Sequence, residues 1–91
     1  MEVKLGMIVK SIAGHDKGKF LVIKAIEGDF AYIADGKERK LDSPKKKRIK
    51  HLRLTNTVID THNLTDKGLR RVISEYTDKS LNKPNAQNPD I

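Results

Sequence analysis

Cysteine is absent from the 91 residues of this chain, and so is tryptophan. Without cysteine the chain has no disulfide framework and no thiolate metal site, which is typical of a protein in a reducing compartment. The longest uninterrupted apolar run, FLVI at residues 20–23, is far shorter than the roughly 20 residues of a membrane span. The N-terminal stretch MEVKLGMIVK lacks the apolar region of a secretory signal. These absences predict a soluble intracellular protein with no membrane partner.

Histidines and aromatic residues are also few: three His, two Phe and two Tyr. His15, His51 and His62 stand in no recognisable metal-ligand or triad spacing. A chain of this length forms one domain with a modest core, which suits a small barrel better than a deep catalytic pocket. The sequence therefore predicts no enzyme, no metal site and no cofactor.

Charge is abundant and unevenly placed. Residues 37–53 carry nine basic and two acidic side chains, a net charge of +7, while the rest of the chain has ten of each sign. The whole net charge of the protein thus lies in one short segment. A field concentrated in this way attracts polyanions, of which phosphate backbones are the commonest.

The first half of the sequence is typical of short strands joined by tight turns. Alternating apolar residues mark LGMIVKSIA (5–13), KFLVIKAI (19–26) and FAYIA (30–34). The runs ERKL (38–41) and HLRL (51–54) are the expected fourth and fifth strands, on either side of a loop DSPKKKR that Pro44 keeps out of a ladder. Asp35-Gly36 fits a type I′ turn, in which both residues have positive φ. We predict a mainly β fold, a small SH3-like barrel over residues 1–56.

The second half changes period. After a linker at 57–64, Leu69, Val72, Ile73 and Tyr76 form one apolar stripe of a helix predicted over 65–76. Thr65 is the expected N-cap, and the stripe is expected to dock on the barrel. Residues 77–91 have few apolar side chains and two prolines, which predicts a disordered, flexible tail.

One stretch, GMIVKSIAGHDKGKFLVIKAI (6–26), resembles the KOW motif of ribosomal and transcription-associated proteins. The likeness continues through YIADGKERKLDSPKKKRIKHL (32–52), which is similar to large-subunit ribosomal proteins of this group and their small bacterial relatives. The resemblance covers roughly residues 3–54 and implies an SH3-like barrel that contacts ribosomal RNA through its loops. It also implies a cytoplasmic, ribosome-associated protein.

The loop GHDKGK gives this reading a separate physical basis. Gly14 and Gly18 permit positive φ and a close backbone approach to phosphate, and the loop is expected to lie near the basic segment. The partners predicted are RNA, in particular ribosomal RNA of the large subunit, and ribosomal proteins, with the free protein a monomer. The candidate RNA-binding residues are His15, Lys17, Gly18, Lys19, Lys37, Arg39, Lys40, Lys45, Lys46, Lys47, Arg48, Lys50, His51 and Arg53.

Alternatives remain open at this point. Small SH3-like barrels also bind peptides, so the basic loop is alternatively a docking or targeting segment of a protein-interaction module. Such a module needs a groove lined with aromatics, and Phe30 and Tyr32, on one face of the third strand, are candidates either for the core or for base stacking. The sequence does not specify the RNA, the role of the helix and tail, or whether the host has a nucleus. It also does not separate a permanent ribosomal component from an assembly or rescue factor.

Overall fold

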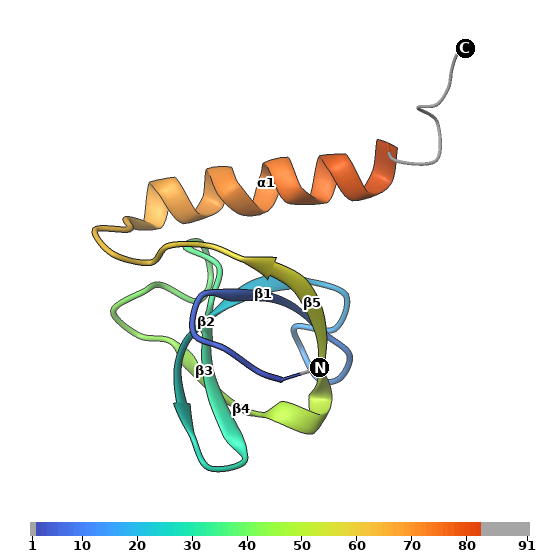
Figure 1. Cartoon of the computed structure of the whole chain (residues 1–91), viewed down its shortest axis with the longest axis vertical. Helices are drawn as coiled ribbons and strands as arrows, with labels where there is room; N and C mark the ends of the chain where they lie inside the picture. The colour runs from blue at the N-terminus through green and yellow to red at the C-terminus, as the bar shows by residue number, and fades with distance from the viewer. Residues whose placement is uncertain (1, 83–91) are drawn as a thin grey trace.

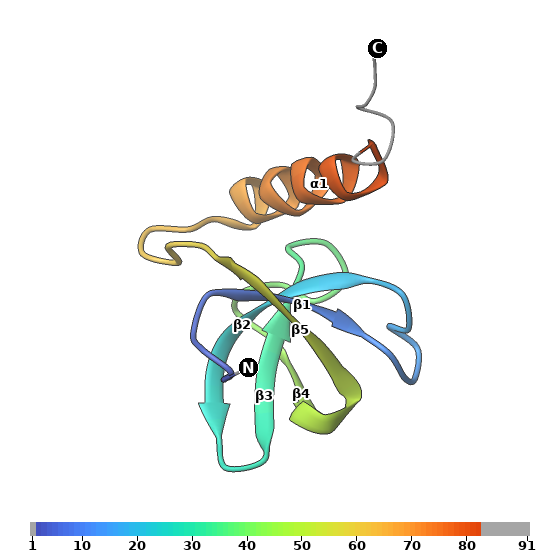
Figure 2. The same cartoon turned by 45° about the vertical axis from the view of Figure 1, so that its right-hand side comes forward.

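The computed structural model describes residues 2–82, with side chains through Asp78. Five antiparallel strands form one curled sheet in the order β4-β3-β2-β1-β5, and a helix lies across one side of it (Figures 1 and 2). The elements are β1 (Met7–Ser11), β2 (Phe20–Glu27), β3 (Phe30–Ala34), β4 (Lys45–Arg48), the 3₁₀ turn η1 (Ile49–His51), β5 (Leu52–Val58) and α1 (Asp66–Asn82). The predicted fold class, a small mainly β barrel of five strands with one C-terminal helix, is confirmed.

Two apolar clusters hold this arrangement together. Inside the curled sheet, alternate residues of the strands pack on one another, with Leu21 and Ile23 of β2 fully buried against Val9 of β1 and Ile33 of β3. The alternation follows from the period of two along a strand. Arg53 points to solvent between Leu52 and Leu54, which face this cluster.

The second cluster lies between the sheet and α1. Leu69 is fully buried against Val22 of β2 and Ala34 of β3, and Leu41 closes the side of the cluster. This explains why β2 is apolar on both faces: one face lines the barrel interior and the other receives the helix. Burial of a side chain such as Leu69 stabilises the fold by about 1.5–3 kcal/mol.

The helix begins as the sequence predicts and ends later. The Gly68 amide donates to Thr65 Oγ1 over 3.0 Å, so Thr65 is the N-cap. The Phe20 and Tyr76 rings meet edge to face with centroids 5.3 Å apart, which secures the helix beyond its second turn. No Gly or Pro interrupts residues 77–82, and α1 therefore continues to Asn82 through the start of the predicted tail. Residues 83–91 of that tail lie outside the described part of the chain.

The boundary of the barrel also lies slightly later than predicted. Strand β5 runs to Val58, and the Ile59 amide donates to the Gly6 carbonyl over 2.8 Å. The connection to the helix therefore starts at residue 59 instead of 57.

The fourth strand was assigned to the wrong residues. The stretch 38–41 is loop and turn, whereas Lys45–Arg48, predicted as loop, forms β4 and pairs with β3 in the register Phe30↔Arg48 to Ile33↔Lys45. Pro44 stands directly before this strand, where its missing N–H costs no ladder bond. The strand lies at the edge of the sheet, where lysines are well tolerated.

The predicted type I′ turn at Asp35-Gly36 is also wrong. Gly36 has φ +80°, but Asp35 is not among the residues with positive φ. The Asp35 carboxylate instead accepts hydrogen bonds from the Lys37 and Arg39 amides at 2.8 and 2.9 Å, which shapes a longer loop. Within residues 2–82, no helix has the length and apolarity needed to cross a bilayer.

Candidate nucleic-acid interface

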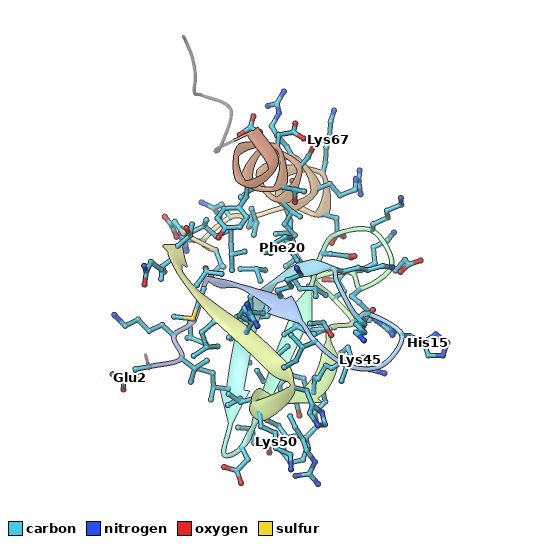
Figure 3. All side chains as sticks on the ribbon, turned by 90° about the vertical axis from the view of Figure 1, so that its right-hand side faces the viewer. Glu2, His15, Phe20, Lys45, Lys50 and Lys67 are labelled. Carbon is cyan, nitrogen blue, oxygen red and sulfur yellow. The ribbon has the colours of Figure 1, made fainter. Side chains whose placement is uncertain are left out.

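The β1–β2 loop, residues 12–19, is folded tightly on itself. Gly14 and Gly18 have φ of +78° and +89°, as predicted. The amides of Lys17, Gly18 and Lys19 donate to the carbonyls of Gly14, Ser11 and Asp16. A phosphate that approaches this backbone closely, as the sequence predicts, therefore meets no free N–H at these three positions, because all three amides are already bonded. The loop offers side chains instead: His15 and Lys17 are exposed, and His15 projects outward (Figure 3).

The β3–β4 loop, residues 35–44, is held in place by contacts with the helix. Arg70 Nη1 donates to the Gly36 carbonyl over 2.6 Å, and the Leu41 amide donates to the Asp66 carboxylate over 2.8 Å. Gly36 is buried, and a Cβ at this position would lie 2.4 Å from the Asp66 carbonyl oxygen. The helix thereby fixes a loop whose Lys37 and Lys40 are exposed.

These two loops are joined to each other, as the sequence predicts. Lys19 forms an ion pair with Glu38, and the Arg39 guanidinium lies 3.6 Å from the carboxylate of Asp16. The hydrogen bond to Glu38 raises the pKa of Lys19 above its ordinary value. Residues some twenty positions apart thus form one continuous loop surface, and we call it, together with the adjoining start of β4, the loop face. The candidates on it that are exposed and take no part in these two ion pairs are His15, Lys17, Gly18, Lys37, Lys40 and Lys45.

Three of the predicted RNA-binding residues instead hold the loops in place. Lys47 is only 9 % exposed and its Nζ donates to the Ala13 carbonyl, which connects β4 to the β1–β2 loop. Lys19 and Arg39 are engaged with Glu38 and Asp16. Their charge still adds to the field of the loop face, but each of the three already contacts another group of the protein.

The Asp16–Arg39 contact is buried and incompletely bonded. Asp16 is 2 % exposed, and neither its Oδ2 nor the Nε of Arg39 has a hydrogen-bond partner among the described residues. A buried carboxylate is costly unless a charge compensates it, so the guanidinium is needed where it lies. Asp16 therefore connects the β1–β2 loop to the β3–β4 loop.

A second basic group occupies the outer face of β3 and β4. The Lys46 ammonium and the Arg48 guanidinium lie 4.7 and 4.9 Å from the centroid of the Phe30 ring. Lys46 Nζ also lies 3.4 Å from the Glu27 carboxylate, which accepts a hydrogen bond from the Tyr32 hydroxyl over 2.9 Å. The hydrogen bond from Tyr32 and the nearby Lys46 ammonium lower the pKa of Glu27. The same hydrogen bond raises the pKa of Tyr32. We call this group the β3–β4 face.

The last three predicted residues, Lys50, His51 and Arg53, follow on η1 and the start of β5. Lys50 lies at the end of the barrel away from the helix (Figure 3). The structure therefore divides the fourteen candidates between the loop face, the β3–β4 face and this end, and does not gather them at one point.

Two cations near the loop face were not predicted. A groove of about 530 Å³ between α1 and the loops is lined by Lys10 and Arg70 as well as by Gly18, Lys37 and Phe20. Lys10 lies 5.7 Å from the Phe20 ring centroid, on the β1 side that alternation turns away from the barrel interior. Arg70 follows the buried Leu69 on the helix, so its position depends on how α1 docks.

Of the four aromatic side chains, Phe20 alone lines the groove beside α1, whereas the grooves of peptide-binding barrels are lined with several aromatics. Phe20 packs on Tyr76, and Phe30 lies under Lys46 and Arg48. Among residues 2–82 no group of three or more His, Cys, Asp or Glu side chains is arranged to hold a metal ion. Neither a scan against protein-family models nor a search of curated proteins finds a match to this chain.

Proposed function

We propose that this protein binds RNA through the loop face, as a binding protein and not as an enzyme. The observation that carries the proposal is the joining of the β1–β2 and β3–β4 loops by the Asp16–Arg39 and Lys19–Glu38 contacts. Because of it, four exposed lysines from separate parts of the chain, at positions 17, 37, 40 and 45, belong to one fixed surface. Such a surface suits a phosphate backbone, which provides negative charges at regular intervals.

The resemblance to the KOW motif supports the choice of RNA and extends it. It favours ribosomal RNA of the large subunit as the target, with ribosomal proteins as neighbours, and a cytoplasmic, ribosome-associated location. In this proposal, the phosphates contribute most of the affinity and the shape of the two loops sets the orientation. The scarcity of exposed aromatic side chains also favours phosphate contacts over extensive base stacking.

The test replaces three exposed lysines of the loop face, Lys17, Lys37 and Lys40, by Gln. A matched control replaces Lys4, Lys67 and Arg71 by Gln; these are also exposed, but Lys67 and Arg71 lie on the helix and Lys4 precedes β1. Both variants lose the same charge. We expect the loop variant to bind a ribosomal RNA fragment at least tenfold more weakly than the control variant, measured by fluorescence anisotropy at constant salt.

Equal losses in the two variants would mean that RNA responds only to total charge, and would contradict a site on the loop face. The ribosomal part of the proposal has its own test. The protein is expected to sediment with ribosomal particles in a low-salt sucrose gradient and to leave them as salt is raised. Its confinement to the top fractions at low salt would contradict association with ribosomes while leaving RNA binding to be judged by the anisotropy measurement.

A further inference from the structure

A depression at the end of the barrel away from the helix belongs to neither the loop face nor the groove beside α1. It has a volume of about 420 Å³ and is lined by Asp29, Arg48, Ile49 and Lys50. Its lining comes from the β2–β3 turn on one side and from the end of β4 and η1 on the other, and the Ile49 amide donates to the Asp29 carbonyl over 2.8 Å. This backbone hydrogen bond therefore joins the two sides of the depression.

One wall carries a guanidinium held in place by an aromatic ring. Arg48 is exposed, yet its guanidinium lies 4.9 Å from the centroid of the half-buried Phe30 ring. Lys46 lies near the same ring and is itself bound to Glu27, so the surroundings of Arg48 are ordered. Nucleic-acid bases stack on guanidinium planes much as they stack on aromatic rings. The Phe30–Arg48 pair thus offers a stacking surface although Phe30 itself is covered.

The opposite wall carries a carboxylate among cations. Asp29 is exposed, and no side chain in the described part of the chain forms an ion pair or a hydrogen bond with its carboxylate, although Arg48 and Lys50 line the same depression. A carboxylate repels phosphate, so Asp29 does not serve a purely electrostatic RNA surface. It accepts hydrogen bonds from N–H groups, and guanine presents two parallel donors, N1–H and N2–H, on its Watson–Crick edge.

We propose that this depression binds an unpaired guanine of RNA. The base stacks on the Arg48 guanidinium, its N1–H and N2–H groups donate to the Asp29 carboxylate, and the Lys50 ammonium contacts an adjacent phosphate. Adenine lacks this pair of donors, and inosine has N1–H but no N2 amino group, so both should bind more weakly. The proposal rests on the proposed RNA binding and adds base selectivity to it.

The experiment compares a short oligouridine containing one central guanine with the same oligomer containing adenine or inosine. We expect the wild type to bind the guanine oligomer about tenfold more tightly than the adenine oligomer, with inosine between them. Asp29→Asn removes the acceptor pair with little change in size. It should abolish the preference for guanine while binding of plain oligouridine stays the same or rises, because a negative charge is lost.

Two further variants separate selectivity from charge. Asp42→Asn, at an exposed acidic residue of the β3–β4 loop, makes the same charge change and should keep the preference for guanine. Arg48→Lys keeps the charge and loses the stacking plane, so it should reduce the preference.

A wild type that binds all the oligomers equally, or an Asp29→Asn variant that keeps the preference, would overturn the guanine site and leave the proposed RNA binding intact. Failure of every oligomer and of ribosomal RNA to bind even at low salt would overturn both proposals.

Discussion

Lys45 and Lys47 stand two residues apart on β4 and carry the same charge, but only one of them is free. Lys45 is exposed, whereas Lys47 is buried with its Nζ bonded to the Ala13 carbonyl. We expect Lys47→Ala to destabilise the protein by about 1–3 kcal/mol, since it removes a charged donor and leaves the Ala13 carbonyl with only the hydrogen bond from the Ser11 hydroxyl. Lys45→Ala should change the free energy of unfolding by under about 0.5 kcal/mol. Urea unfolding curves of the two variants measure the difference.

For RNA binding we expect the reverse order, with the larger effect in Lys45→Ala. In Lys45→Ala the fall of log K with log[salt] should become less steep by about 0.7–0.9, the amount due to one phosphate contact. A stability loss in Lys45→Ala equal to that in Lys47→Ala would contradict the assignment of Lys47 as the structural member of the pair.

Tyr32 permits a direct test of the β3–β4 face. Its hydroxyl donates to Glu27, which favours the neutral phenol and raises the pKa of Tyr32 above the ordinary value of 10.0. A raised pKa of this kind stabilises the fold at pH values below 10, and the contribution is lost as pH rises through the folded-state value. Glu27→Gln should therefore lower the pKa of Tyr32, measured as phenolate absorbance during alkaline titration. A Tyr32→Phe variant identifies which transition belongs to Tyr32, and an unchanged transition in Glu27→Gln would contradict the contact.

At the scale of elements, the β3–β4 loop is the connection between the loop face and the helix. Gly36 and Gly18 both have positive φ, so Ala costs about 1–2 kcal/mol of backbone strain at either position. A Cβ at Gly18 meets nothing within 4 Å, whereas at Gly36 it meets the Asp66 carbonyl oxygen of α1. Gly36→Ala should therefore cost about 1–3 kcal/mol more than Gly18→Ala.

The additional loss of stability in Gly36→Ala should arise because the new methyl group pushes α1 away from the β3–β4 loop. We expect trypsin to cleave this variant faster than Gly18→Ala at Lys67, Arg70 and Arg71, all of which lie on the helix. Equal stability and equal cleavage of the two glycine variants would show that the helix does not depend on this contact.

The sequence predicts the elements whose period is unambiguous. Apolar alternation identified the first three strands and HLRL of the last one, and the stripe from Leu69 to Tyr76 identified the helix. It did not identify β4, because a run of lysines and an arginine has a low intrinsic preference for strand. Pairing with β3, cation–π contacts to Phe30 and the burial of Lys47 override that preference. All three depend on residues distant in sequence.

The sequence predicts which residues are candidates for the site, but it predicts only partly which of them are exposed and which are paired within the protein. The proximity of the two loops followed from the expected meander. Which cations are neutralised did not, because it depends on the register that brings Asp16 to Arg39 and Glu38 to Lys19. The sequence alone makes Asp29 a turn residue, and the depression that it shares with Arg48 becomes visible only in the folded chain.

At the scale of the whole molecule, the net charge of +7 is presented mainly by exposed cations of the loop face and the two groups beyond it. Contact with about five phosphates predicts a slope of log K against log[salt] near −3.5 to −4.5. Anisotropy titrations with one RNA over a range of salt concentrations measure this slope. A flat response would mean that the affinity comes from something other than phosphate contacts, and would favour a protein-interaction module.

The edge position of β4 also affects solubility. A strand at a sheet edge is a template on which another chain can add, and exposed lysines such as Lys45 and Lys46 of β4 disfavour such addition by mutual repulsion. A polyanion that neutralises those lysines removes the repulsion while the edge stays open. Mixtures with RNA should therefore turn cloudy near charge balance and clear again when either component is in excess, which light scattering across a range of mixing ratios would detect.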